Sequence, residues 1–131
     1  MPPTDAPPAR QLLSLHPVLV TADIPGTLRH YQDTLGFAKK FESGGPAFYA
    51  AASRDGIALH FRHLDSPPVR GERGADVVDV YITVADMDRL HSELVGRGAK
   101  VIYGPARQDY GMKEFYVEDC NGCRLAFGQQ I

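Results

Sequence analysis

The feature that most constrains the fold of this chain is an internal repeat. The first half contains a strand-like run, a helical pattern and three short extended segments, expected near residues 15–22, 23–36, 37–42, 47–53 and 57–63. The second half shows the same order, with elements expected near residues 78–84, 86–98, 99–103, 112–119 and 123–128. The sequence therefore predicts two β-α-β-β-β modules at 13–64 and 77–129, joined by a polar linker at 65–76.

Matching helix starts and turns in the two halves support the repeat. Asp23 and Asp86 each precede an apolar helical stripe and are expected to cap the N-terminus of the helix that follows. Asp55-Gly56 and Asn121-Gly122 are each typical of a tight hairpin turn before a last strand. Because one module alone would bury little apolar surface, the two modules are expected to pack together.

The correspondence extends to single residues. Leu59-His60-Phe61 matches Leu125-Ala126-Phe127, because each triplet begins three residues after the glycine of its turn. Phe48-Tyr49 is likewise expected to match Phe115-Tyr116. Equivalent positions in the two modules can therefore be compared directly when candidate site residues are sought.

Composition is that of an ordinary globular protein and argues against several partners. Hydrophobic residues make up 44% and charged residues 23% of the 131 residues, and the net charge is -2. Without a basic surplus, binding to the phosphate backbone of a nucleic acid is not expected. No apolar run approaches the roughly 18–20 residues of a membrane span, so no membrane partner is expected either.

The N-terminal residues 1–11 are rich in proline and contain no apolar stretch. They are expected to form a disordered tail rather than a signal peptide, which needs a charged start and an apolar core. Without an export signal, the expected compartment is the cytoplasm.

The two cysteines, Cys120 and Cys123, form a C-x-x-C pattern. Such a pattern can be redox-active, or it can supply half of a zinc site. No second cysteine pair accompanies it, and the intervening Asn121-Gly122 is typical of a tight turn. The favoured interpretation is two reduced cysteines that flank a turn.

Five stretches of sequence carry a resemblance to a known family, and they are Val20–Ile24, Tyr31–Phe37, Arg54–Phe61, Val84–Leu90 and Tyr110–Phe115. They resemble the vicinal oxygen chelate superfamily, which includes glyoxalase I, extradiol dioxygenases, and the fosfomycin-resistance and bleomycin-resistance proteins. The last stretch is similar to the W-G-x-R-E-F motif of the bleomycin-resistance branch, with Tyr110 and Lys113 as conservative departures. The D-P-x-G-N motif that usually follows in the family lacks its proline here, where Cys120 follows Asp119.

The resemblance covers about residues 13–129 and implies an α+β fold. Each module would curl its mixed sheet into a half-cup, with the helix on the outer face and the ligand site on the concave face. By strand alternation, the helix-covered side is expected to hold Leu19, Phe48, Leu59, Phe61, Val80, Ile82, Phe115, Val117, Leu125 and Phe127. The concave side is expected to hold His16, Val18, Val20, Tyr49, Ala58, His60, Arg62, Asp79, Tyr81, Thr83, Met112, Glu114, Tyr116, Arg124 and Ala126.

Metal-dependent members of this family take ligands from the first and last strands of each module. The repeat places His16, Asp79, His60 and Ala126 at these four positions, so three of them could hold a divalent metal. Against a metal, Ala126 stands where such relatives usually have Glu, and Asp79 stands where they usually have His. The alternative is that His16 and His60 are polar pocket residues without a metal.

Two classes of function are open at this point. The first is non-enzymatic binding or sequestration of a small molecule, of the bleomycin-resistance type, in a concave groove between the two subunits of a homodimer. Aromatic side chains would suit a planar or cationic ligand, with Asp79 and Glu114 to balance its charge, whereas Arg62 and Arg124 would suit an anion. The second is a metal-dependent lyase, isomerase or dioxygenase that acts on a small oxygen-chelating substrate.

The residues expected to bind the ligand are His16, Tyr49, His60, Arg62, Asp79, Tyr81, Tyr110, Glu114, Tyr116 and Arg124. Only His16, His60 and Asp79 are candidate metal ligands, and no other cofactor is expected. Residues 107–110 lack strand periodicity and precede Gly111, so they are expected to form a mobile rim of the groove.

Overall fold

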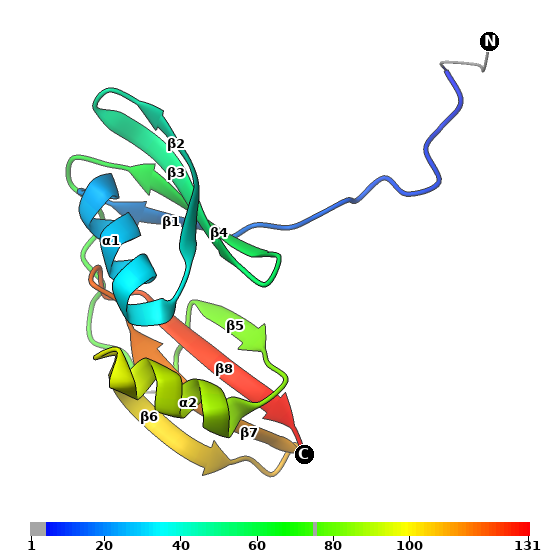
Figure 1. Ribbon diagram of the computed structural model, residues 1–131, viewed down its shortest axis with the longest axis vertical. Helices are drawn as coiled ribbons and strands as arrows, with labels where there is room; N and C mark the ends of the chain where they lie inside the picture. The colour runs from blue at the N-terminus through cyan, green and yellow to red at the C-terminus, as the bar shows by residue number, and fades with distance from the viewer. Residues whose placement is uncertain (1–4, 75) are drawn as a thin grey trace.

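The computed structural model describes residues 5–74 and 76–131, and its helices and strands follow one another in two matching sets. The first set is β1 (Val18–Thr21), α1 (Ile24–Leu35), β2 (Ala38–Gly44), β3 (Ala47–Arg54) and β4 (Ile57–His63). The second set is β5 (Val80–Thr83), α2 (Met87–Gly96), β6 (Lys100–Arg107), β7 (Met112–Glu118) and β8 (Arg124–Gln130). The predicted α+β architecture of two β-α-β-β-β modules is confirmed (Figure 1).

Each module forms its own four-stranded mixed sheet. The strand orders are β1-β4-β3-β2 and β5-β8-β7-β6. In both sheets the first strand pairs in parallel with the last, and the other neighbours are antiparallel. Figure 1 shows each helix lying across one face of its own sheet. The opposite, helix-free face of each sheet is called its concave face below.

Local sequence explains where both helices begin. The Asp23 carboxylate accepts a hydrogen bond of 3.0 Å from the backbone N–H of Gly26, and Asp86 accepts one of 3.1 Å from Arg89. Gly36 ends α1 with φ 73°, a left-handed conformation that favours glycine. Both predicted caps are therefore confirmed.

The first strand is shorter than predicted. It begins at Val18 rather than at residue 15, because Pro17 has no N–H to donate to a strand ladder. In the second module, β5 begins at Val80 rather than at residue 78, and β6 continues to Arg107, four residues beyond its expected end.

The predicted core side of the sheets is correct with one exception. Leu59, Phe115 and Leu125 are at most 1% exposed, as expected for residues beneath a helix. Phe48 has the right alternation but is 61% exposed, because it lies beside Gly44 at the end of the β2–β3 hairpin, outside the hydrophobic cluster. The prediction that Phe48 belongs to the core was wrong.

Strand pairing also corrects the predicted match between Phe48-Tyr49 and Phe115-Tyr116. In the first sheet His60 pairs with Ala51, and in the second sheet the equivalent Ala126 pairs with Tyr116. Ala51 is therefore the counterpart of Tyr116. Two residues earlier on each strand, Tyr49 is the counterpart of Glu114. The predicted match of the two aromatic pairs was therefore wrong by a register shift of two residues.

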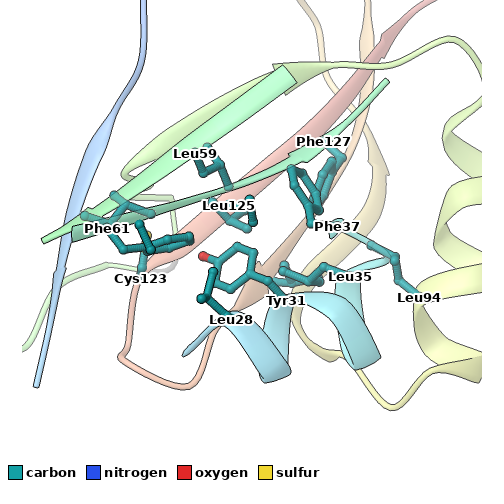
Figure 2. Packing of buried hydrophobic residues seen from close by; sticks show 14 of the residues in the cluster. Leu28, Tyr31, Leu35, Phe37, Leu59, Phe61, Leu94, Cys123, Leu125 and Phe127 are labelled. Carbon is teal, nitrogen blue, oxygen red and sulfur yellow. The ribbon is translucent and has the colours of Figure 1, made fainter. Parts of the chain in front are cut away.

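One hydrophobic cluster contains residues from both modules. Its members include Tyr31 and Leu35 of α1, Phe61 of β4, Leu94 of α2 and Leu125 of β8. Figure 2 shows Tyr31 pointing from α1 into this cluster, among side chains of both modules. The modules therefore share a core, as the small size of each one requires.

Polar contacts fix the same junction between the modules. The buried Tyr31 hydroxyl donates a 2.6 Å hydrogen bond to Oδ2 of Asp119, in the turn before β8. The other oxygen of Asp119 accepts backbone N–H groups of Asn121 and Cys123, each at 2.8 Å. One carboxylate thus shapes the turn of the second module and holds it against the helix of the first.

The described ends of the chain are less regular. Residues 5–17 form neither helix nor strand, whereas residues 1–4 of the predicted disordered tail lie outside the described part. Disorder over 1–11 stays a prediction. Among the residues that the structure describes, no helix is long and apolar enough to cross a membrane.

The C-x-x-C segment forms the turn between β7 and β8. Cys120 is exposed, Cys123 is buried, and both are free thiols. Burial raises the pKa of both thiols above the ordinary range, which disfavours the reactive thiolate. Gly122 has φ 79°, as a tight turn of this kind requires.

The variant Tyr31→Phe tests the junction. It leaves the buried Asp119 carboxylate without its hydroxyl donor, so the free energy of unfolding should fall by about 1–3 kcal/mol in urea titrations. Tyr103→Phe is the matched control, because its hydroxyl lies in a part-exposed contact with Gln108, and its cost should be at most about 1 kcal/mol. Equal losses in the two variants would contradict the importance assigned to the junction.

Candidate functional site

The two concave faces carry different side chains at equivalent positions. Where the first module has Val18, His60, Ala51 and Tyr49, the second has Tyr81, Ala126, Tyr116 and Glu114. At three of these four positions, the residue in one sheet is much smaller than its counterpart in the other, and at the fourth Tyr49 corresponds to Glu114. The fold repeats, but the chemistry of the two candidate half-sites does not.

The concave face of the first module centres on two imidazole rings. His16 precedes β1 and stacks on His60 of β4, with ring centroids 4.4 Å apart and planes 10° apart. The Tyr49 hydroxyl lies 2.9 Å from Nδ1 of His60, and Phe41 of β2 contacts the same ring edge-on. Burial, with smaller effects of His16 and Lys40, lowers the pKa of His60, which favours its neutral form.

The concave face of the second module centres on a carboxylate. Glu114 of β7 is fully buried and accepts hydrogen bonds from three tyrosine hydroxyls. Tyr81 donates to Oε2 at 2.5 Å, while Tyr110 and Tyr116 donate to Oε1 at 2.7 and 3.2 Å. These four residues are called the Glu114 cluster below.

The three phenols are held in their protonated form by this arrangement. Burial and then Glu114 raise the pKa values of Tyr81 and Tyr116, whereas for Tyr110 the hydrogen bond to Glu114 is the larger cause. The approach of Tyr81 depends on Gly128, because a Cβ atom at that position would overlap the Tyr81 hydroxyl. Tyr103 of β6 completes the aromatic surface, with its ring 4.7 Å from that of Tyr116.

Asp79 does not contact the Glu114 cluster and is bound by the linker instead. Arg73 donates to both of its oxygens at 2.9 Å, Arg70 lies 2.7 Å from Oδ1, and the backbone N–H of Arg124 donates to Oδ2. The hydrogen bonds from Arg73 are the largest cause that holds the pKa of Asp79 well below its usual range. The structure thus gives Asp79 two cationic partners within its own chain.

Arg124 is also engaged in fixing the linker. Its guanidinium donates to the carbonyl oxygens of Gly74 at 2.6 Å and Val77 at 3.3 Å. Arg62 of β4 is exposed, on the concave face of the other module. Of the expected ligand-binding residues, the structure therefore brings together Tyr81, Tyr110, Glu114 and Tyr116 in one group, and His16, Tyr49 and His60 in another.

The residues do not fit a metal centre within one chain. His16 and His60 are neighbours, but the oxygens of Asp79 already accept three hydrogen bonds from Arg73 and the Arg124 backbone and form an ion pair with Arg70. No group of three His, Cys, Asp or Glu side chains suited to a metal ion occurs among residues 5–74 and 76–131.

The concave face of the second module is partly accessible to solvent, because Tyr81 and Tyr110 are exposed. A cleft of about 500 Å³ lies between the modules, where Leu35, Phe37, Ile82, Leu90 and Phe127 contribute to its lining. It contains neither His60 nor Glu114. This cleft is therefore distinct from the two candidate half-sites.

Sequence reasoning missed four residues of these surroundings. Phe41 and Tyr103 lie on β2 and β6, which were expected but not assigned inward positions, and both strands carry register shifts that interrupt simple alternation. Arg70 and Arg73 lie in the linker, where no periodicity indicates a partner. Only the tertiary structure pairs them with Asp79.

The Glu114 cluster can be tested by titrating its phenols. In Glu114→Gln the negative charge that disfavours tyrosinate is gone, so Tyr81, Tyr110 and Tyr116 should ionise at lower pH than in the wild type. Tyrosinate absorbance against pH measures this shift. The control variant Glu42→Gln removes a carboxylate from β2 of the first module, on the helix-covered side of its sheet, and should leave the titration unchanged. An unchanged curve for Glu114→Gln would contradict the cluster.

Comparison with known proteins agrees with this geometry. Residues 14–127 match the sequence profile of the Glyoxalase/Bleomycin resistance protein/Dioxygenase superfamily. A curated relative, the virulence protein STM3117 of Salmonella typhimurium, is 26% identical over 121 residues, which cover 88% of this chain and 83% of the relative.

Two solved structures are also similar. One is the bleomycin-binding protein of bleomycin-producing Streptomyces verticillus in complex with copper(II)-bleomycin, with 31% identity, a TM-score of 0.68, and coverage of 90% of this chain and 96% of that one. The other, a glyoxalase-related enzyme of Clostridium phytofermentans, has a TM-score of 0.76 at 18% identity over 94% of this chain and 98% of that one, which shows the fold alone. The chain belongs to the glyoxalase/bleomycin resistance protein/dioxygenase superfamily.

Proposed function

We propose that this protein binds and sequesters a small organic molecule, without transforming it, in a concave groove shared by two copies of the chain. The observation that carries this proposal is the aromatic concave face of the second module. Tyr81 and Tyr110 leave 44% and 61% of their surface exposed, around a carboxylate that has no cationic partner in the described chain. Exposed aromatic rings beside a buried polar group are typical of sites for heteroaromatic or cationic ligands.

The exposure of apolar side chains supports a second copy. Leu12, Leu13 and Leu15 before β1 are 76–88% exposed, and Val18 on the edge strand is 51% exposed. Several large apolar side chains exposed within one segment are common at interaction sites of soluble proteins. A homodimer would cover this surface and bring a second wall to the open concave faces.

The likeness to the bleomycin-binding protein of Streptomyces verticillus supports binding rather than catalysis. The engagement of Asp79 by Arg70 and Arg73 supports the same choice, because that carboxylate is unavailable for acid–base or metal chemistry while the ion pairs persist. The polar residues that remain on the concave faces serve recognition.

Thermal unfolding with copper(II)-bleomycin as the probe tests this function. Ligand at 100-fold above its dissociation constant should stabilise the protein by about 2.7 kcal/mol, seen as a rise in Tm. The variant Tyr81→Ala/Tyr110→Ala should lose this rise, whereas Phe48→Ala, which removes an exposed aromatic ring from β3 of the first module, should keep it. An unchanged Tm in the wild type would count against sequestration of bleomycin-like compounds.

Sedimentation equilibrium should give twice the mass of one chain, because the exposed apolar surface before and on β1 favours association. A monomer at the concentrations used for ligand binding would contradict the shared groove.

Metal analysis of protein purified without an affinity tag separates this function from a metal-dependent enzyme. We expect less than one tenth of an equivalent of Fe, Mn, Ni or Zn, because Asp79 is engaged by arginines. A near-stoichiometric metal that is lost in His16→Ala or His60→Ala would instead favour a lyase, isomerase or dioxygenase.

A further inference from the structure

The charged groups of the concave faces are unequally available to a ligand. Asp79 is ion-paired with both Arg70 and Arg73, and the guanidinium of Arg124 is bound to the carbonyl oxygens of Gly74 and Val77. Among the carboxylates of this face, Glu114 has no cationic partner in the described part of the chain, because its hydrogen-bond partners are three neutral hydroxyls. Glu114 is therefore the carboxylate of this face that is free to attract a cation.

The partners of Glu114 stabilise its charge without cancelling it. Three neutral hydroxyls donate hydrogen bonds to the carboxylate, which offsets the cost of burial but leaves a net negative charge inside an aromatic surface. Three tyrosines surround this charge, and the ring of Tyr103 packs against that of Tyr116. Aromatic rings around a negative charge are the arrangement that attracts organic cations, through the ring faces as well as the carboxylate.

Access to the carboxylate depends on Tyr110. Glu114 is fully buried, whereas Tyr110 is 61% exposed and lies in the turn between β6 and β7, beside Gly111 with φ 83°. Its hydroxyl is bonded to Oε1 of Glu114. Displacing Tyr110 would exchange one hydrogen bond from a neutral donor for a stronger one from a charged donor. The other two phenols would stay in place, because Tyr116 is buried and Tyr81 reaches Oε2 through the space that Gly128 leaves.

We propose that the Glu114 cluster is the subsite that receives the positively charged end of the ligand, an aromatic amine or related organic cation, and that Tyr110 is the cover which the cation displaces. This inference rests on the proposed binding function and specifies its ligand class. The first module, with its neutral histidine pair and Tyr49, would contact the uncharged part of the same ligand.

Three matched probes test the proposal: benzylamine, which is a cation at neutral pH, benzyl alcohol, which is neutral, and benzoate, which is an anion. In ligand-observed NMR titrations of the wild-type protein, benzylamine should bind at least about tenfold more tightly than benzyl alcohol, and benzoate most weakly. Equal affinities, or a preference for benzoate, would overturn the proposal.

Variants test whether Glu114 causes the preference for benzylamine. Glu114→Gln should abolish the advantage of benzylamine over benzyl alcohol. Glu42→Gln, which removes a carboxylate from the helix-covered side of the first module's sheet, should retain it. Tyr110→Phe should bind benzylamine as tightly as the wild type or more tightly, because no hydroxyl then has to leave Oε1. A tenfold loss in Tyr110→Phe would show that this hydroxyl is a contact rather than a cover, and would overturn that part of the proposal.

The outcomes also separate this inference from the function on which it rests. If copper(II)-bleomycin stabilises Glu114→Gln as much as the wild type, the proposed binding function is retained and the cation subsite is overturned. If neither bleomycin nor any of the three probes binds, both proposals fail. Because selectivity among the probes is measured first on the unaltered protein, the test does not depend on the folding of Glu114→Gln.

Discussion

The hydrogen bond between Tyr31 and Asp119 joins the two modules, and the arrangement of the rest of the structure depends on this junction. Its donor lies in the middle of α1, and its acceptor lies in the turn that leads into β8. Because the same carboxylate also accepts the N–H groups of Asn121 and Cys123, the turn cannot keep its shape if Asp119 moves away. The position of β7, and with it that of Glu114, is therefore tied to the helix of the other module.

This shared junction lets the two concave faces diverge. Since the helix-covered sides carry the packing, residues on the concave sides are released from the requirement to be apolar. One face has become a pair of stacked histidines with a tyrosine, and the other a carboxylate among phenols. Two more charged residues of the second module are engaged within the chain, because Arg70 and Arg73 bind Asp79 and the carbonyl oxygens of Gly74 and Val77 bind Arg124.

Much of the fold could be predicted because it depends on periodicity and punctuation. The apolar stripe containing Tyr31 and Leu35, the caps Asp23 and Asp86, and the match of Leu59 to Leu125 all follow from local spacing. The errors arose where spacing alone is insufficient. Phe48 has the alternation of a core residue but lies beyond the cluster, and matching Phe48-Tyr49 to Phe115-Tyr116 overlooked how each strand pairs with its neighbour.

The sequence by itself determined the two β-α-β-β-β modules, the sides of the sheets that are buried, and the set of side chains from which a site could be built. Only the tertiary structure decided which of these side chains meet. Tyr81 and Glu114 are 33 residues apart, and Arg73 reaches Gly122 across 49 residues. The physical reason is that periodicity specifies which face a side chain occupies, whereas a hydrogen bond requires two particular atoms within about 3 Å.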